Sequence, residues 1–207
     1  KEKTVLINIS LSDVDDMVVT GTSQNEIQVV KKGLDGTFTI KDRGHIRYFL
    51  GLEVASNESG ITINQRKDTL DLIKDMNLEN SSTVGFPIPK GLKLSIDEEK
   101  FLPEPGVYMR LIGSLLYLNL SKPDISYLVQ NLSQFIGQPR LPHMKAIHVV
   151  KYLKSTINAE LFYPSQNSLK LKAYSDSYYG GCAFSSRSLS GYSIFLRNFL
   201  ISWKTKK

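Results

Sequence analysis

The stretch that most constrains the structure of this chain reads Val5-Leu-Ile-Asn-Ile-Ser-Leu-Ser-Asp-Val-Asp-Asp-Met-Val-Val-Thr-Gly21. Val5–Leu11 and Met17–Thr20 are rich in apolar and β-branched residues, and three Asp residues lie between them. This pattern predicts a β-hairpin with an acidic tip. Carboxylates that lie close together repel one another unless a cation joins them. The tip is therefore either a divalent-metal site for substrate phosphates or an ordinary solvated turn.

Composition is that of a globular protein. The 207 residues are 41% hydrophobic and 22% charged, which is enough for a sizeable core in one or two domains. The single cysteine, Cys182, excludes an intramolecular disulfide framework and favours a reducing intracellular compartment, cytoplasm or nucleus. No apolar run approaches the ~20 residues of a membrane span. Because the chain starts without Met or a signal peptide, we expect a piece of a longer protein.

Positive charge gathers toward the carboxyl terminus. Residues 138–207 hold 11 Lys and Arg against 2 Asp and Glu, whereas residues 1–137 hold 15 against 18. Tyrosines lie among these basic residues, which suits phosphate contact with base stacking and equally a solvated basic surface. The candidate nucleic-acid contacts in this part are Lys151, Lys154, Lys170 and Lys172.

Periodicity predicts the elements that follow the hairpin. We expect helices over 24–35, after a Ser23–Glu26 capping box, and over 66–76, with Leu70, Ile73 and Met76 on one face. Short strands are expected over 37–40, 46–54 and 61–64. Residues 77–106, with four prolines and no periodicity, should form a loop or linker.

Three more helices and a set of strands complete the expected order. The helical stripes are Tyr108, Leu111, Leu115 and Leu118; Ile125, Leu128, Leu132 and Phe135; and Ala146, Val150 and Leu153. Gly113-Ser114 should allow a neighbouring backbone to approach closely. Strands are expected over 161–163, 169–174, 192–196 and 200–203. Helix and strand patterns in separate blocks predict an α+β fold.

Further motifs follow the acidic hairpin in a fixed order. They are Ile46-Arg-Tyr-Phe-Leu-Gly-Leu-Glu-Val54, Leu111-Ile-Gly-Ser-Leu-Leu-Tyr-Leu118, Lys122-Pro-Asp-Ile-Ser-Tyr127, Leu132-Ser-Gln-Phe135, Tyr152-Leu-Lys-Ser-Thr156, Tyr174-Ser-Asp-Ser177, Ser190-Gly-Tyr192 and Ile201-Ser-Trp-Lys204. Together with Val14-Asp15-Asp16, this series resembles the reverse transcriptase and early RNase H segments of copia-type LTR retrotransposon Pol polyproteins. The resemblance covers essentially the whole chain.

The resemblance implies three parts. Residues 1–80 would be a partial palm with the Val-Asp-Asp hairpin, 81–158 a linker and helical thumb or connection, and 159–207 the start of an RNase H-like sheet. The implied activity is RNA-directed DNA synthesis with Mg²⁺. The implied partners are an RNA template, a DNA primer, the RNA–DNA hybrid and the remainder of the Pol polyprotein, with no membrane.

The resemblance also assigns roles to single residues. Asp15 would be the main metal ligand of the polymerase site, assisted by Asp16. Asp176, which we expect at the end of its strand, would be the first metal-binding carboxylate of RNase H. The alternative from the residues alone is a strand-end Asp that caps a turn before Gly180-Gly181. Tyr48, in the hairpin that helps to hold the primer strand, is a candidate nucleic-acid contact, whereas Phe49 suits core packing.

The chain departs from the family pattern in two places. Asp13 stands where the hairpin motif usually has an aromatic residue, and Tyr178-Tyr179 stand where Asp-Trp is more frequent. The resemblance also implies an upstream Asp strand and further nuclease carboxylates that this chain does not contain. We therefore expect the fragment to be inactive alone. The alternative is a non-catalytic nucleic-acid-binding remnant of a decayed element.

Overall fold

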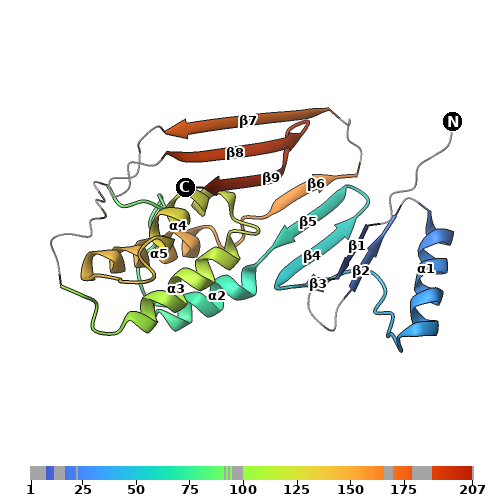
Figure 1. Cartoon of the computed structure of the whole chain (residues 1–207), viewed down its shortest axis with the longest axis horizontal. Helices are drawn as coiled ribbons and strands as arrows, with labels where there is room; N and C mark the ends of the chain where they lie inside the picture. Colours follow the sequence, from blue (N-terminus) through green and yellow to red (C-terminus); the bar gives the residue numbers. More distant parts are fainter. Residues whose placement is uncertain are drawn as a thin grey trace. The chain divides into compact units, whose positions relative to one another are not determined.

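The structure is a computed structural model that describes residues 8–11, 17–21, 23–90, 92, 94, 100–165, 170–178 and 188–206, with side chains from residue 17 onward except that of Tyr178. Contacts divide the chain into two compact units, Lys1–Leu50 and Gly51–Lys207. Helices and antiparallel strands occur in separate blocks (Figure 1), so the predicted α+β class is confirmed.

The first unit contains the predicted hairpin. Strands β1 (Asn8–Leu11) and β2 (Met17–Thr20) pair antiparallel, with Asn8 opposite Thr20 and Leu11 opposite Met17. Two extended β-branched segments of equal length therefore pair as the sequence predicts. The acidic tip itself lies outside the described residues.

Helix α1 (Gln24–Thr37) follows the hairpin and begins at the predicted cap, where Ser23 Oγ accepts from the Glu26 N–H at 3.4 Å. The predicted strand over 37–40 is wrong. The helix continues through Thr37, and the Phe38 N–H donates to the Leu34 carbonyl at 2.7 Å, closing one more turn. Phe38 to Ile40 then have no regular structure, and the described part of the unit ends with the short strand β3 (Tyr48–Phe49).

The second unit begins with a sheet built from two distant parts of the sequence. Strands β4 (Leu52–Asn57) and β5 (Gly60–Asn64) form a hairpin, and β6 (Leu161–Pro164) pairs antiparallel with β5. Gly60 lies opposite Pro164, where an added Cβ would come within 2.2 Å of the Tyr163 carbonyl oxygen. The two backbones thus approach too closely there for any side chain.

Four helices build the core of this unit. They are α2 (Arg66–Asp75), α3 (Pro105–Leu118), α4 (Ser126–Ser133) and α5 (Ile147–Ser155), with 3-10 turns η1 (Pro123–Ile125) and η2 (Leu141–Ala146) leading into the last two. Helix α2 contacts α3 and α5, and α3 contacts α4. Every residue of the three predicted stripes is buried in one core, so these helices and their inner faces are confirmed.

Two predictions about the helices are wrong. Leu70 is 45% exposed, whereas the other two predicted residues, Ile73 and Met76, are buried together with Thr69 and Leu72. Helix α2 contacts both α3 and α5, so its buried face is centred between positions 69 and 73 and position 70 lies at the edge of that face. Gly113 does not mark a close backbone approach, because nothing lies within 4 Å of a Cβ built there.

A three-stranded antiparallel sheet ends the chain, in the order β7 (Leu171–Tyr178), β8 (Leu189–Leu196) and β9 (Phe199–Lys206). Figure 1 shows the three strands side by side. The Trp203 Nε1 atom donates to the Asn119 carbonyl at 3.2 Å, and the Tyr163 hydroxyl donates to the Leu200 carbonyl at 2.9 Å. These bonds hold β9 against the end of α3 and against β6.

The division at residues 80 and 158 into palm, thumb and RNase H stays a prediction. Both positions lie inside the second unit, and the β5–β6 pairing joins residues on the two sides of the second boundary.

Candidate nucleic-acid site

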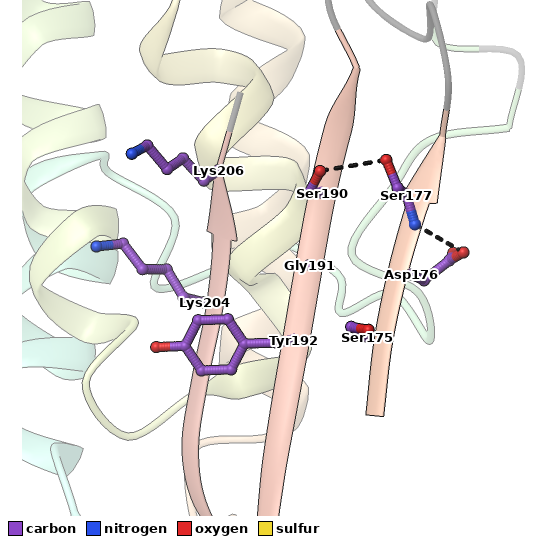
Figure 2. A pocket seen from close by; sticks show the side chains of 8 residues that line it. All are labelled: Ser175, Asp176, Ser177, Ser190, Gly191, Tyr192, Lys204 and Lys206. Atoms are coloured by element: carbon purple, nitrogen blue, oxygen red, sulfur yellow. Dashed lines mark hydrogen bonds between the residues drawn. The ribbon is translucent and has the colours of Figure 1, made fainter. Parts of the chain in front are cut away.

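An open hollow of about 540 Å³ lies over the carboxyl-terminal sheet, at the end where β7 and β9 finish. Figure 2 shows its lining, which consists of Ser175, Asp176, Ser177, Ser190, Gly191, Tyr192, Lys204 and Lys206. Three hydroxyl groups of serine, one phenol and two ammonium groups therefore meet in one place. All of them can donate hydrogen bonds to an anion.

Strand register sorts these side chains onto two faces. Ser175, Tyr192 and Lys204 form one row across the sheet, and Ser177, Ser190 and Lys206 form another, two residues further on. Directly opposed residues share a face, and so do residues two apart. Both rows therefore lie on the same face, where Ser177 Oγ and Ser190 Oγ are 3.2 Å apart.

Asp176 belongs to the row between these two, with Gly191 and Thr205. Its carboxylate consequently points to the opposite face from the lysines, as Figure 2 shows. Its Oδ1 atom accepts from the Ser177 N–H at 2.9 Å. The prediction that Asp176 ends its strand is wrong, because β7 continues to Tyr178.

The surroundings of Asp176 do not make a magnesium site by themselves. Mg²⁺ takes hard oxygen ligands in octahedral geometry, and carboxylates hold it in proteins. The row of Asp176 adds only a glycine and a threonine hydroxyl. In the described part of the chain, no group of three or more His, Cys, Asp or Glu side chains is placed to hold a metal ion.

The polymerase candidates Asp15 and Asp16 lie outside the described residues, so their roles stay predictions. Tyr48 is described, in β3 of the first unit. Its side chain is 53% exposed, whereas Phe49 beside it is half-buried. About half of the Tyr48 surface is therefore in contact with solvent, and stacking on a base needs such accessible ring surface.

The four predicted lysines have different surroundings. Lys154 donates from Nζ to the carbonyl oxygens of Leu78 at 3.1 Å and of Ser81 at 2.7 Å, and also to that of Glu79. These contacts use its three N–H donors within the protein. Lys172 Nζ donates to Asn198 Oδ1 at 3.3 Å on an exposed surface.

Lys151 and Lys170 have no side-chain hydrogen bond or ion pair within the described residues. Lys151 lies half-buried on α5, and Lys170 lies exposed just before β7. The structure does not bring the four lysines together with Lys204 and Lys206 in the hollow. Sequence reasoning missed Lys204 and Lys206 as candidate contacts. The alternation Trp203-Lys204-Thr205-Lys206 could have indicated them, because it places both ammonium groups on one strand face.

Two of the family-like motifs meet in space. Lys122 is 2% exposed and donates from Nζ to the Thr156 carbonyl at 3.1 Å and the Ala159 carbonyl at 2.5 Å. Two residues further on, Asp124 Oδ2 accepts from the Tyr152 hydroxyl at 2.5 Å. Lys122-Pro-Asp and Tyr152-Leu-Lys-Ser-Thr therefore interlock around the end of α5. Their role in this chain is to hold the helical core together.

A second, smaller hollow of about 150 Å³ lies between α2 and α3, lined by Asp68, Asp71, Leu72, Asp75, Ser114, Tyr117 and Leu118. Burial raises the pKa of Asp68 above its ordinary value, the nearby charge of Asp71 adds to this rise, and a hydrogen bond from Gln65 opposes it. Gly51 faces this carboxylate, since an added Cβ would lie 2.7 Å from Asp68 Oδ2. The negative charge of this hollow disfavours phosphate.

Among the described residues, no helix is both long and apolar enough to cross a bilayer.

Comparison with known proteins agrees with the family that the sequence resembles. The family model of reverse transcriptase (RNA-dependent DNA polymerase) matches residues 2–90. The retrovirus-related Pol polyprotein from transposon RE1 of Arabidopsis thaliana is 35% identical over 94% of this chain and 13% of its own length. The polyprotein from transposon TNT 1-94 of Nicotiana tabacum is 28% identical over 96% of the chain and 16% of its own length. No solved structure matches the chain significantly.

A third relative is of similar size. An uncharacterized mitochondrial protein of Arabidopsis thaliana is 32% identical over 94% of this chain and 81% of its own length. The chain belongs to the reverse transcriptase family of transposon Pol polyproteins. The transposons concerned are of the copia type, and the chain spans about 13% of the length of the RE1 polyprotein.

Proposed function

We propose that this chain is the part of a copia-type reverse transcriptase that holds the RNA–DNA hybrid and leads into RNase H. The observation that carries the proposal is the hollow on β7, β8 and β9, where two lysines and three serines share one sheet face in a chain of this family. Polymerases of this kind act on long polyanions, so a surface that neutralises successive phosphates is the first requirement.

The chemistry of the hollow suits a nucleic-acid backbone. Lys204 and Lys206 are both exposed and form no ion pair within the described residues. They are two residues apart on β9, so their Cα atoms repeat at about 6.6–6.8 Å. The exposed phenol of Tyr192 adds a ring beside them. Asp176 also lines the hollow, but strand register places its carboxylate in the row between the two lysine rows and on the opposite face of the sheet.

The polymerase chemistry would belong to the hairpin in the first unit. Asp15 and Asp16 would hold Mg²⁺, with Asp15 as the main ligand because adjacent strand residues point to opposite faces. The ions, when bound, stabilise the attacking and leaving oxygens of nucleotidyl transfer. Two neighbouring carboxylates supply few of the ligands that two Mg²⁺ ions need, and Asp13 adds charge without an obvious ligand direction. We therefore infer that this chain alone is inactive and binds Mg²⁺ weakly.

The alternative is a non-catalytic remnant that binds nucleic acid without synthesis. The departures at Asp13 and at Tyr178-Tyr179 favour it. Both versions place the protein in a reducing compartment inside the cell, with the rest of the Pol polyprotein as the partner in the first version. Both also require the hollow to bind the hybrid, so binding is the property to test first.

The test is a salt titration with a labelled RNA–DNA hybrid. The unmodified chain should bind with an affinity that falls between about 50 and 200 mM salt, and K204Q/K206Q should lower the salt slope by about 0.9 for each lost contact. K74Q/K90Q removes the same charge from exposed positions outside the hollow and is the matched control. Absence of binding at low salt would refute the proposal. Equal salt slopes for K204Q/K206Q and K74Q/K90Q would show that the hollow is not the binding surface.

A further inference from the structure

Helix α3 is apolar on the side that faces solvent as well as on the side that faces the core. Arg110 is the one charged residue among its 14 residues. Met109, Leu116 and Tyr117 are 43%, 42% and 41% exposed, and Leu120, just after the helix, is 51% exposed. A surface helix normally turns charged and polar residues to solvent, and a helix that is apolar all round is buried on every side. The outer side of α3 therefore has the composition of a contact surface.

The exposed apolar residues form one stripe. Met109, Gly113, Leu116 and Leu120 follow one another at intervals of four, three and four residues. Residues at this spacing lie one above the other along a helix. We call these four residues the outer stripe. Gly113 is near its middle, and a Cβ built there has nothing within 4 Å, so a second helix can approach the backbone closely at this point.

Opposite charges flank the outer stripe at different heights. Arg110, Ser114 and Tyr117 form the neighbouring stripe of α3, on the side of α2. At the level of Ser114 and Tyr117 this side borders the acidic hollow, whereas Arg110 lies one to two turns nearer the start of the helix. Asp71 in the hollow is exposed, and its charge helps to raise the pKa of Asp68. Neither Arg110 nor Asp71 forms an ion pair within the described residues.

We propose that the outer stripe is the interface of a homodimer, in which α3 of a second copy packs antiparallel across Gly113. Two-fold symmetry is the commonest arrangement of homo-oligomers. An axis at Gly113 places Arg110 of each copy opposite Leu116 of the other, because positions three before and three after the axis face each other. The axis also keeps the α2 sides of the two copies on one side of the interface. Arg110 of each copy thus lies beside the acidic hollow of the other and pairs with Asp71 there.

The charges select both the direction of packing and the kind of partner. A parallel arrangement would place the two Arg110 side chains against each other, whereas the antiparallel arrangement forms the Arg110–Asp71 pair twice. The carboxylates beside the stripe repel phosphate, so a nucleic-acid backbone is a poor occupant. One helix face is smaller than the roughly 800 Å² that each partner buries in a standard interface, so the dimer is weak and its population depends on protein concentration.

The test is sedimentation of the full chain, treated with nuclease, from low to high micromolar protein concentration. The unmodified chain should change from monomer to dimer over this range. M109E/L116E places a carboxylate on each side of Gly113 and should weaken dimerisation about a hundredfold, because the two copies would bury four unpaired charges. V29E/L70E adds the same charge at exposed apolar positions of α1 and α2 and should dimerise as the unmodified chain does. Circular dichroism shows that each variant is folded.

Charge exchange tests the antiparallel pairing separately. R110E and D71R each replace an opposite-charge pair by a like-charge pair, twice in the dimer, and each should raise the dimer Kd about tenfold. R110E/D71R exchanges the two charges and should return the Kd to within about threefold of the unmodified chain. R110E/E58R has the same net charge but leaves Asp71 unchanged, and it should stay weak. If R110E/D71R dimerises no better than R110E/E58R, the proposed interface is wrong.

Three further results would overturn the inference. They are a chain that stays monomeric at every concentration, a dimer that M109E/L116E and V29E/L70E weaken equally, and a dimer that is present before nuclease treatment and absent after it. The last result would show that nucleic acid joins the copies. The inference goes beyond the proposed function and is independent of it, because hybrid binding at low salt is measured with the hollow variants and does not require α3 to pair.

Discussion

Lys154 Nζ lies 3.1 Å from the carbonyl oxygen of Leu78, a residue 76 positions earlier in the chain. The same ammonium group also serves Glu79 and Ser81, and Ser155 Oγ donates to the Val84 carbonyl at 3.0 Å. Residues 78–84 follow α2 and contain no regular element. Helix α5 therefore supplies hydrogen-bond donors to the carbonyls of this segment, in addition to the bonds that Ser81 makes to the Leu78 carbonyl. A lysine predicted to contact nucleic acid has a structural role in the protein.

Replacement of Lys154 by methionine should lower the free energy of unfolding by about 1.5–3 kcal/mol, because several carbonyls lose a charged donor. Lys151, on the same helix and without a side-chain bond in the described residues, is the matched control. K151M should change stability by no more than about 0.5 kcal/mol. Urea unfolding followed by circular dichroism measures both. Equal stabilities for the two variants would contradict the structural role.

Gly60 and Gly113 should respond oppositely to alanine. G60A places a Cβ 2.2 Å from the Tyr163 carbonyl oxygen and 2.8 Å from Pro164 Cα, which forces β5 and β6 apart. We expect a loss of at least about 2 kcal/mol. G113A adds a methyl group in open space on α3 and should gain about 0.5–1 kcal/mol from helix propensity. Thermal unfolding of the two variants checks the β5–β6 pairing. A harmless G60A would show that the two strands are not in this register.

Tyr108 is completely buried, and its hydroxyl donates to the Leu132 carbonyl at 2.8 Å. Burial raises the pKa of this phenol well above its ordinary value. Y108F should cost about 1–2 kcal/mol, since the core loses the hydrogen bond from the phenol to the Leu132 carbonyl, which keeps its bond from the Phe135 N–H. Y127F, at a side chain that is 49% exposed, should cost almost nothing. The measurement is denaturant unfolding of the two variants, and equal stabilities would contradict the buried bond.

The bond between Tyr152 and Asp124 predicts a loss of stability in alkali. Burial and the hydrogen bond to Asp124 raise the pKa of Tyr152 to about 12 from an ordinary value of 10.0. The folded protein therefore holds this proton more tightly than the unfolded chain does. The stabilisation is fully present below the unfolded pKa and is lost as pH rises through about 12. The difference in unfolding free energy between the unmodified chain and Y152F should shrink over this range. A difference that does not vary with pH would show that the bond does not form in solution.

Primer extension on an RNA template addresses catalysis. We expect no extension by the purified chain with Mg²⁺, because Asp15 and Asp16 supply too few oxygens for two ions. D15N serves as the comparison and should also be inactive, while its RNA–DNA hybrid binding should persist because that binding depends on the lysines. Clear extension by the unmodified chain that is abolished in D15N would show that the site is sufficient as it stands.

The sequence by itself determined the local elements of this protein. Helix stripes such as Tyr108, Leu111 and Leu115 follow from the 3.6-residue period, and the β1–β2 hairpin follows from two β-branched runs around an acidic tip. These features depend on neighbours within a few residues, so the local sequence contains the cause. The family follows as well, because many short motifs in one order restrict ancestry far more than any one of them.

Only the tertiary structure decided which side chains are free to bind a ligand. Lys154 and Lys204 are both lysines in the basic region of the sequence. Lys154 donates hydrogen bonds to carbonyls of residues 78–81, whereas the ammonium group of Lys204 on β9 lines the hollow. The difference depends on backbone that folds in from more than 70 positions away, which no local pattern records. Charge balance likewise counts Asp42 as one free negative charge, whereas its carboxylate pairs with Lys31 Nζ on α1 at 2.8 Å. Pairings of this kind depend on geometry in three dimensions, because an ion pair or hydrogen bond forms only where two groups come within a few ångströms.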